Sequence, residues 1–396
     1  MSGVDAITAS QSLEWIKQLM RIDTISRNSN LGLIETVRDH LQRLGLECWL
    51  SFNEPRSKAN LFCTIPDARG GIDGGIVLSG HTDVVPVQGQ DWESDPFVPT
   101  LRDDRLYGRG AADMKGFIGV VLAQVPELLR RRLSIPVHLA LSFDEEIGCV
   151  GAPLMLQQLR ERQVHPASCI VGEPTNMQLV VAHKGLSAFR CRVKGVAAHS
   201  SVPDTGVNSI EYAAQVIDFV RSLSERMRAA GPRDASFDVP YSTALTSSVR
   251  GGGVMNTVPD FCELELTLRH LPDVDVEALA GEVRGYVDTV LLPQMRSVAA
   301  DVPRIDFDRT VHVPGFEAEE AAQFTRLMRR LSRDEVMRKV AYGTEAGLFQ
   351  QSGVATVVCG PGDIRQAHRP NEYVSLSQIR RCETFLSELA DELTVQ

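Results

Sequence analysis

The spacing of hydrophobic positions predicts alternating helices and strands in the first part of the chain. Helical spacing over residues 11–21 and 31–44 predicts two helices, and Gly45 is a suitable residue to end the second. The apolar runs expected to form strands are Leu61–Ile65, Ile76–Ser79, Val137–Phe143 and Cys169–Val171. Helical patterns separate them at 116–132, with a kink expected at Pro126, and at 151–161. This alternation predicts a mostly parallel sheet with helices on both faces.

The middle of the chain has a different pattern, in which short alternating strands come in pairs. The expected order is a strand at 186–195, a helix at 207–229, strands at 242–250 and 261–269, a helix at 275–291 and a strand at 304–312. This β-α-β-β-α-β order is typical of a small ferredoxin-like domain with two layers. After residue 316 the alternation of helices and strands resumes. It comprises a helix, a glycine-rich segment, an apolar run at Ala355–Cys359 and a last helix at 375–393.

These patterns predict two domains. A chain of 396 residues is long for a single hydrophobic core. We expect an α/β domain formed by residues 1–182 and 314–396. The β-α-β-β-α-β domain, residues 183–313, is expected to be inserted into it.

Composition narrows the class of protein. The formal net charge of −10 argues against nucleic acid or an anionic membrane as the main partner. The first residues, MSGVDAITASQSLEW, lack the basic start and apolar core of a secretory signal. No stretch approaches the roughly 18 apolar residues of a membrane span. Eight scattered cysteines without a C-x-x-C pair are typical of reduced thiols, so we expect a cytoplasmic protein.

Histidines and acids follow the predicted strands at several separate places. The segments are SGHTDVVPV (79–87), YGRGAADMKG (107–116), LALSFDEEIGCVGA (139–152), IVGEPT (170–175) and CGPGDIRQAHRPNEYV (359–374). The carboxyl ends of strands are where α/β sheets place their sites. Three adjacent acids after an apolar strand, Asp144, Glu145 and Glu146, are unfavourable to bury unless cations meet them.

Taken together, these segments supply the ligands of a two-metal site. The candidate ligands are His81, Asp113, Glu146, Glu173 and His368. They comprise one bridging carboxylate, with one histidine and one glutamate for each metal. Imidazole and carboxylate ligands without thiolate suit zinc, or cobalt and manganese.

Two further acids have expected roles beside these ligands. Asp83 can accept the second ring N–H of His81 and fix its tautomer. Glu145 does not ligate and is free to act as general base. Each segment also has an ordinary explanation: a hydrogen-bonded histidine at a strand end, Asp113 as a helix N-cap, or acids at a solvated helix start. The combination of five segments favours the metal site.

In order and spacing, the HTD, GAADMKG, DEEIG and GEPT motifs resemble the zinc-dependent aminoacylase, carboxypeptidase and deacylase family of two-domain metallopeptidases. The resemblance covers nearly the whole chain. It implies that His81 and Glu173 bind one metal, that Glu146 and His368 bind the other, and that Asp113 bridges them. It also implies hydrolysis of an N-acyl bond, with Glu145 as base and Asp83 orienting His81. The inserted domain would act as a lid and as the interface of a homodimer.

The same resemblance assigns three residues of the inserted domain to the substrate. His199, in GVAAHSSVP, would reach into the partner subunit's site and donate to the oxyanion. Asn256 and Arg269 would hold the substrate's α-carboxylate, which a guanidinium matches well. From spacing alone, His199 is an ordinary loop histidine and Arg269 a surface arginine at a strand end.

The glycine-flanked segment GTEAGLFQQSG (343–353) and the final loop resemble the branch of the family that deacetylates N-acetylornithine. Glu345 could then pair with the cationic side-chain amine of that substrate. Alternatively, Thr344 caps a short helix at Leu348–Gln351 and Glu345 complements its dipole. The competing enzyme activities are desuccinylation of N-succinyl-diaminopimelate, a dipeptidase and a general aminoacylase. A binding protein on an inactive enzyme scaffold is the alternative that is not an enzyme.

Overall fold

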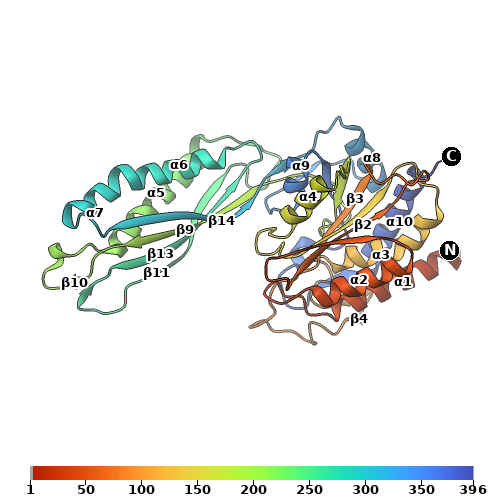
Figure 1. Ribbon diagram of the computed structural model, residues 1–396, viewed down its shortest axis with the longest axis horizontal. Coiled ribbons are helices and arrows are strands. Elements are labelled where there is room, and N and C mark those ends of the chain that lie inside the picture. Colours follow the sequence, from red (N-terminus) through yellow and green to blue (C-terminus); the bar gives the residue numbers. More distant parts are fainter. Residues whose placement is uncertain (1–2, 396) are drawn as a thin grey trace. The chain divides into compact units, whose positions relative to one another are not determined.

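The computed structural model describes residues 3–395, and the chain divides into two compact units. Unit 1 consists of Met1–Ala182, Phe316–Arg338 and Thr344–Gln396, and unit 2 of His183–Gly315 and Lys339–Gly343 (Figure 1). Unit 2 is therefore an insertion between two halves of unit 1. It also takes the short segment Lys339–Gly343 from the C-terminal half.

Unit 1 is built around a nine-stranded sheet whose inner strands are parallel. These are β6 (Val137–Ser142), β3 (Ile76–His81), β7 (Ser168–Val171) and β17 (Ala355–Val358). All residues of β3, β6 and β7 are buried, as expected for apolar strands covered on both faces. The prediction of a mostly parallel sheet is confirmed.

The outer strands depart from the parallel pattern. The sheet order is β1-β2-β6-β3-β7-β17-β8-β15, and β16 pairs with β8. Its outer strands are β1 (Cys48–Phe52), β2 (Ala59–Ile65), β8 (Val180–His183), β15 (Phe316–Glu317) and β16 (Arg338–Val340). Strands β1 and β2 are antiparallel to their neighbours. All five residues of β1 are only half-buried, so this strand lacks the apolar run that marks the inner strands.

Helices cover both faces of this sheet (Figure 1). They are α1 (Gly3–Met20), α2 (Leu31–Arg43), α3 (Lys115–Arg130), α4 (Ala152–Glu161), α8 (Gln323–Ser332), α9 (Ala346–Gln351) and α10 (Leu376–Glu392). Helices α1, α3 and α10 pack on one another, and α4 packs on α9. The β3–α3–β6 and β6–α4–β7 connections run in opposite directions along the sheet, so right-handed crossovers place α3 and α4 on opposite faces.

One local prediction about these helices is confirmed. Gly45 has φ of 84° and follows Leu44, the C-cap residue of α2; glycine adopts this left-handed conformation without strain. Pro126 lies inside α3, and the kink expected there stays a prediction. Among the described residues, every helix is too short or too polar to cross a lipid bilayer.

A small three-stranded sheet joins distant parts of unit 1. It contains β4 (Thr100–Arg102), β5 (Arg105–Tyr107) and β18 (Tyr373–Ser375), in the order β18-β5-β4. Tyr107 pairs with Tyr373. The start of the loop that carries Asp113 therefore lies beside the end of the loop that carries His368.

Unit 2 has the expected β-α-β-β-α-β order. Its main elements are β9 (Gly185–Lys194), α5 (Ser209–Ala230), β11 (Thr243–Gly251), β13 (Phe261–His270), α6 (Val276–Tyr286) and β14 (Arg304–Val313). The strands form an antiparallel sheet in the order β11-β13-β9-β14. Every second residue of β9 and β13 is buried, in one core with residues of α5 and α6.

The second helical region of unit 2 is longer than expected. Helix α6 continues through a π-helical turn at Val287–Leu291 into α7 (Leu292–Val298), whereas the sequence pattern predicted an end at residue 291. Pro293 does not stop the helix because it lies in the first turn of α7, where a missing backbone N–H is tolerated. A separate two-stranded ribbon, β10 (Ala198–His199) with β12 (Thr257–Val258), carries His199.

Candidate metal centre

The ends of three parallel strands bring the candidate ligands to one edge of the sheet. His81 is the last residue of β3 and lies opposite Ser142, the last residue of β6. Glu146 follows β6, and Glu173 follows β7. Because the strands are parallel, their carboxyl ends meet at the same edge, as the sequence predicted.

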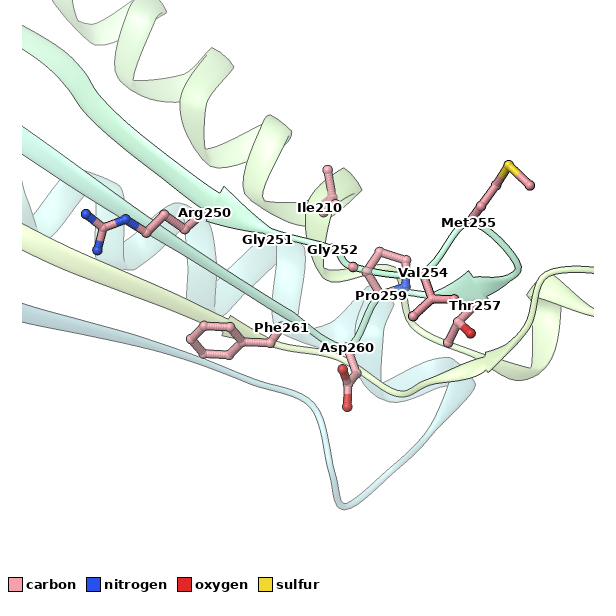
Figure 2. Close-up of a pocket in the computed structure, with 11 residues that line it drawn as sticks. Ile210, Arg250, Gly251, Gly252, Val254, Met255, Thr257, Pro259, Asp260 and Phe261 are labelled. Carbon is pink, nitrogen blue, oxygen red and sulfur yellow. The ribbon is translucent and has the colours of Figure 1, made fainter.

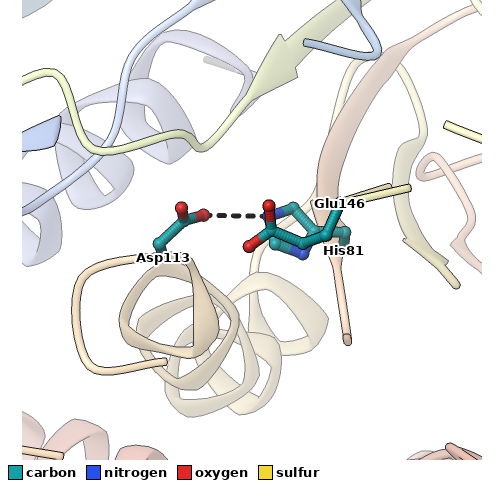
Figure 3. Close-up of side chains that lie close together, drawn as sticks. All are labelled: His81, Asp113 and Glu146. Carbon is teal, nitrogen blue, oxygen red and sulfur yellow. Dashed lines mark hydrogen bonds and ion pairs between the residues drawn. The ribbon is translucent and has the colours of Figure 1, made fainter. Parts of the chain in front are cut away.

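Asp113 lies between the two candidate histidines. Its Oδ1 is 3.0 Å from Nε2 of His81, and its Oδ2 is 3.4 Å from Nε2 of His368. Figure 3 shows the Asp113 carboxylate facing the His81 ring across from Glu146. Asp113 does not cap α3, because the N-cap residue is Met114 and no side chain caps that helix. Each oxygen of Asp113 thus faces a different imidazole, which is the arrangement that a bridging carboxylate needs.

The two glutamates complete two groups of donors around Asp113. Glu173 Oε1 is 3.7 Å from His81 Nε2, and Glu146 Oε2 is 3.0 Å from His368 Nε2. Ligand atoms of His81, Asp113 and Glu146 also lie within 4.8 Å of one another. The structure therefore brings together all five residues that the sequence singled out.

The donor set fits divalent cations. His81, Asp113 and Glu173 are buried, and Oε1 of Glu146 is a buried oxygen that accepts no hydrogen bond among the described residues. Burial raises the pKa of Glu173 well above its ordinary value, and burial with the nearby Asp113 charge raises the pKa of Glu146 to about 7. Buried carboxylates that crowd in this way are stabilised by cations placed between them.

Asp83 supports the site in two ways. The Nδ1 atom of His81 lies 2.9 Å from the backbone carbonyl of Asp83 and 3.6 Å from its carboxylate, so the carbonyl is the nearer hydrogen-bond acceptor. The carboxylate instead accepts the backbone N–H groups of Glu145 at 3.0 Å and Glu146 at 3.3 Å, and the Ser26 hydroxyl at 2.7 Å. Asp83 therefore orients His81 through its backbone, and its side chain holds the turn that carries both glutamates.

Glu145 lies beside the candidate ligands, and its carboxylate lies within 4.8 Å of ligand atoms of His81 and Glu173. The Cys149 thiol donates to its Oε1 at 3.4 Å. Burial raises the pKa of Glu145 well above its ordinary value; the charge of His81 lowers it, and those of Glu146 and Glu345 raise it further. The alternative of an acidic helix start does not hold, since α4 begins only at Ala152.

Glu345 is buried beneath the same strand ends. It is 1% exposed, and the Ser79 hydroxyl donates to its Oε2 at 3.4 Å. Burial raises its pKa to about 7. The Thr344 hydroxyl accepts the N–H of Ala346 at 3.0 Å, as in the helix-cap alternative, whereas the Glu345 side chain makes no capping hydrogen bond.

The candidate substrate residues of unit 2 are exposed, and Arg269 lies far from the other two. His199 contacts Ser201, with 2.8 Å between Nδ1 and the hydroxyl oxygen, and the carbonyl of Asn256 accepts the Ser200 N–H at 2.9 Å. Arg269 lies at the opposite end of β13 and donates to the carbonyl of Ala341 at 3.3 Å.

The length of β13 separates these two ends of unit 2. Eight residue steps lie between Phe261 and Arg269, which corresponds to about 27 Å of strand. His199 and Asn256 belong to the ribbon beyond Phe261, and Figure 1 shows β10 at that end of the sheet. Unit 2 of one copy therefore does not gather His199 and Arg269 into one site.

A hollow of about 750 Å³ lies at the same ribbon end of unit 2. Figure 2 shows the hairpin from Gly251 to Thr257 beside it, with the Met255 side chain projecting away from the backbone. Met255 is 100% exposed and Val254 is 68% exposed. The residues that line this hollow include none of the candidate ligands. The charged residues among them are Arg250 and Asp260.

Sequence reasoning missed two buried charged residues close to the site. Arg109 is 1% exposed and Glu372 is 0% exposed, and they form an ion pair of 2.7 Å. Both lie inside segments that were singled out for other residues, Asp113 and His368. A pattern of charges in a loop does not reveal which of them become buried, so the sequence carried no signal for this pair.

Comparisons with known proteins agree with this site. The sequence profile described as peptidase family M20/M25/M40 matches residues 77–392. A curated acetylornithine deacetylase from Pasteurella multocida is 32% identical over 371 residues, which cover 93% of this chain and 92% of that protein. Another from Proteus mirabilis is 31% identical and covers 96% of both chains.

Solved structures share the fold at lower sequence identity. The aminopeptidase PepT from Bacillus cereus has a TM-score of 0.74 at 19% identity and covers 97% of this chain and 98% of that one. An M20 family metallo-carboxypeptidase from Sulfolobus solfataricus has a TM-score of 0.73 at 18% identity and covers 96% and 98%. The resemblance found in the sequence motifs is confirmed: the chain belongs to peptidase family M20/M25/M40 and is a metal-dependent amide hydrolase.

Proposed function

We propose that the protein hydrolyses N2-acetyl-L-ornithine to L-ornithine and acetate, a step in arginine biosynthesis. The observation that carries the amide hydrolase is Asp113 between two histidine–glutamate pairs, with Glu145 beside them. The substrate rests on similarity to curated acetylornithine deacetylases along almost the whole chain. It also rests on the resemblance of 343–353 to that branch.

We propose His81, Glu173, Glu146 and His368 as the ligands of two zinc ions, with Asp113 bridging. Imidazole and carboxylate donors without a thiolate favour zinc, and cobalt is an alternative. The chemistry that such cations supply is Lewis acidity, which polarises the acyl carbonyl and makes water more acidic. Solved M20 relatives include a peptidase from Bacillus subtilis described as binding a dinuclear metal.

The protein's own residues then move the protons. Glu145 takes a proton from the attacking water and delivers it to the leaving amine. Burial raises the pKa of Glu145, which favours holding this proton until the amine receives it. Asp83 keeps the Glu145 backbone in place through the hydrogen bond to its N–H at 3.0 Å.

We further propose a homodimer in which His199 donates to the oxyanion in the partner subunit's site. The separation of about 27 Å along β13 supports this arrangement, because His199 and Arg269 cannot serve one site from one copy of unit 2. The edge strand β11 supports the dimer as well, since its residues Leu245 and Val249 are 51% and 58% exposed. Asn256, which lies beside His199 and would come from the same partner subunit, and Arg269 of the subunit itself would hold the α-carboxylate. A cytoplasmic location is part of the proposal, supported by eight free thiols.

A panel of N-acyl amino acids tests the substrate. The zinc-loaded protein is incubated with N-acetylornithine, N-succinyl-diaminopimelate, N-acetylmethionine and a dipeptide, and the released amine is measured. The expected result is the highest kcat/KM for N-acetylornithine, and loss of turnover on all four substrates in Asp113→Ala. A higher kcat/KM for the succinyl substrate or the dipeptide would assign the protein to another activity of its family. No turnover of any of the four by metal-loaded protein would instead indicate a binding protein on this scaffold.

A further inference from the structure

A buried polar cluster lies beneath the loop that carries Asp113. Arg109 Nη1 donates to Glu372 Oε2 at 2.7 Å, and Arg109 Nη2 donates to Gln90 Oε1 at 2.7 Å. We call Gln90, Arg109 and Glu372 the Arg109 cluster. Removing a charged pair from water is costly, so a buried ion pair of this kind is weak evidence for a purely stabilising role.

The Glu372 carboxylate fixes the backbone of the Asp113 loop. Its Oε2 accepts the N–H of Gly110 at 3.1 Å. Its Oε1 accepts the N–H groups of Ala112 at 2.9 Å and of Asp113 itself at 3.1 Å. Both oxygens are occupied by hydrogen bonds, so the loop is wrapped around this side chain. The position of the Asp113 backbone therefore depends directly on Glu372.

The same cluster reaches the segment that carries His368. Glu372 follows His368 by four residues. Arg109 Nη1 also donates to the carbonyl of Arg369 at 3.3 Å, and Gln90 Nε2 donates to the carbonyl of His368 at 2.9 Å. Gln90 itself lies in the segment that follows His81. Three chain segments, each with a candidate ligand, are thus joined through one set of side chains.

His368 needs such support more than the other ligands do. Its side chain is 55% exposed, and its backbone has φ of 64°. His81, by comparison, ends a buried strand and is 1% exposed. A buried strand and the hydrogen bond to the Asp83 carbonyl hold His81, whereas His368 depends on hydrogen bonds to its own loop.

We infer that the Arg109 cluster is a positioning device that sets Asp113 and His368 at the separation one cation requires. The inference rests on the proposed two-metal function. The hydrogen bonds of the cluster reach the backbones of the two ligand-bearing loops, so it acts through those backbones. Residues that orient metal ligands in this way affect metal affinity by about 10–100-fold.

Glu372→Gln tests the inference in the full-length protein. The amide keeps the shape of the carboxylate but loses one acceptor oxygen and the charge opposite Arg109. Metal-free protein is titrated with Zn²⁺ by calorimetry and with Co²⁺ by visible absorption. We expect the weaker-binding cation to lose about 10–100-fold in affinity, with a changed Co²⁺ spectrum. Excess metal should restore kcat while KM for the substrate stays unchanged.

Glu383→Gln is the matched control, because Glu383 is another buried carboxylate of unit 1, on α10. It should keep wild-type metal affinities and Co²⁺ spectrum. If Glu372→Gln does not fold, Gln90→Ala takes its place. It removes the exposed hydrogen bond to the His368 carbonyl and should weaken binding of the same cation.

Wild-type affinities and spectra in the folded variant would overturn the inference, even if its Tm falls. Wild-type protein that binds no divalent cation would overturn both this inference and the proposed function. Wild-type protein that binds two cations but hydrolyses no N-acyl amino acid would remove the proposed function alone. The comparison of cation affinities then still decides the role of the cluster.

Discussion

The two units of the chain present their candidate functional residues in opposite ways. In unit 1, His81, Asp113 and Glu173 are buried, and each lies within 4 Å of another candidate ligand. In unit 2, His199 and Arg269 are exposed and lie at opposite ends of the four-stranded sheet. The metal centre is thus assembled within one unit. The candidate substrate residues are not gathered within unit 2, which is the reason for proposing that a partner subunit contributes to the site.

This contrast follows from the architecture of each unit. Parallel strands bring residues from distant parts of the sequence to one edge, so a few strand ends suffice to build a centre. An antiparallel sheet such as β11-β13-β9-β14 has loops at both ends, and residues in consecutive loops lie a strand length apart. A buried centre can be rigid before substrate binds, whereas the exposed candidates of unit 2 lack such support within their own unit.

Replacement of the proposed base in unit 1 should give the largest effect. Glu145→Ala should keep both metals and lose about 10²–10⁴-fold in kcat, because a general base contributes that much and Glu145 is not one of the five proposed ligands. Steady-state kinetics and elemental analysis check both statements. Glu161→Ala, at the exposed end of α4, is the control and should match wild type. Near wild-type kcat in Glu145→Ala would remove Glu145 from this role.

The next effect concerns unit 2 and the dimer. His199→Ala should lower kcat by about 10²–10³-fold, as loss of an oxyanion donor does. If His199 serves the partner's site, mixing His199→Ala with Glu145→Ala subunits should restore part of the activity in mixed dimers. Subunit exchange is verified by mass spectrometry, and His165→Ala, another exposed histidine, is the control. Inactive mixed dimers would mean that each subunit's site is self-contained.

The smallest expected effect concerns Glu345 and substrate choice. A charge-assisted hydrogen bond contributes roughly 1.5–3 kcal/mol, or about one to two decades in kcat/KM. Glu345→Gln should therefore lower kcat/KM for N-acetylornithine by that factor, and far less for N-acetylmethionine. Equal losses on both substrates would assign Glu345 to the metal centre, where its burial beside Ser79 places it. If kcat/KM falls for neither substrate, the only role left for Glu345 is at the start of the short helix.

The sequence predicted most of the fold because the main elements bury apolar faces with clear periodicity. Strands β3 and β6 carry continuous apolar runs, and β9 alternates buried and half-buried residues. Strand β1 was missed because all of its residues are half-buried. The continuation of the second helical region of unit 2 past residue 291, through the π-helical turn at Val287–Leu291, was also missed.

The candidate ligands could also be predicted from the sequence, because each follows a recognisable strand or precedes a helix. The side-chain geometry could not. His81 faces the backbone carbonyl of Asp83 at 2.9 Å, and the Asp83 carboxylate accepts two backbone N–H groups instead. Arg109 and Glu372 become partners across 263 residues of sequence. Hydrogen bonds between residues so far apart in the sequence depend on tertiary structure, and no local sequence pattern predicts them.

The central claim is that two divalent cations bound around Asp113 support amide hydrolysis. The most direct measurement is to remove all metal with a chelator, and then to follow N-acetylornithine hydrolysis while zinc is added in known equivalents. We predict no turnover without metal and a rise that reaches its plateau at about two zinc ions per subunit. Asp113→Ala should bind neither ion tightly and remain inactive. Full activity of the metal-free protein, confirmed by elemental analysis, would contradict the claim.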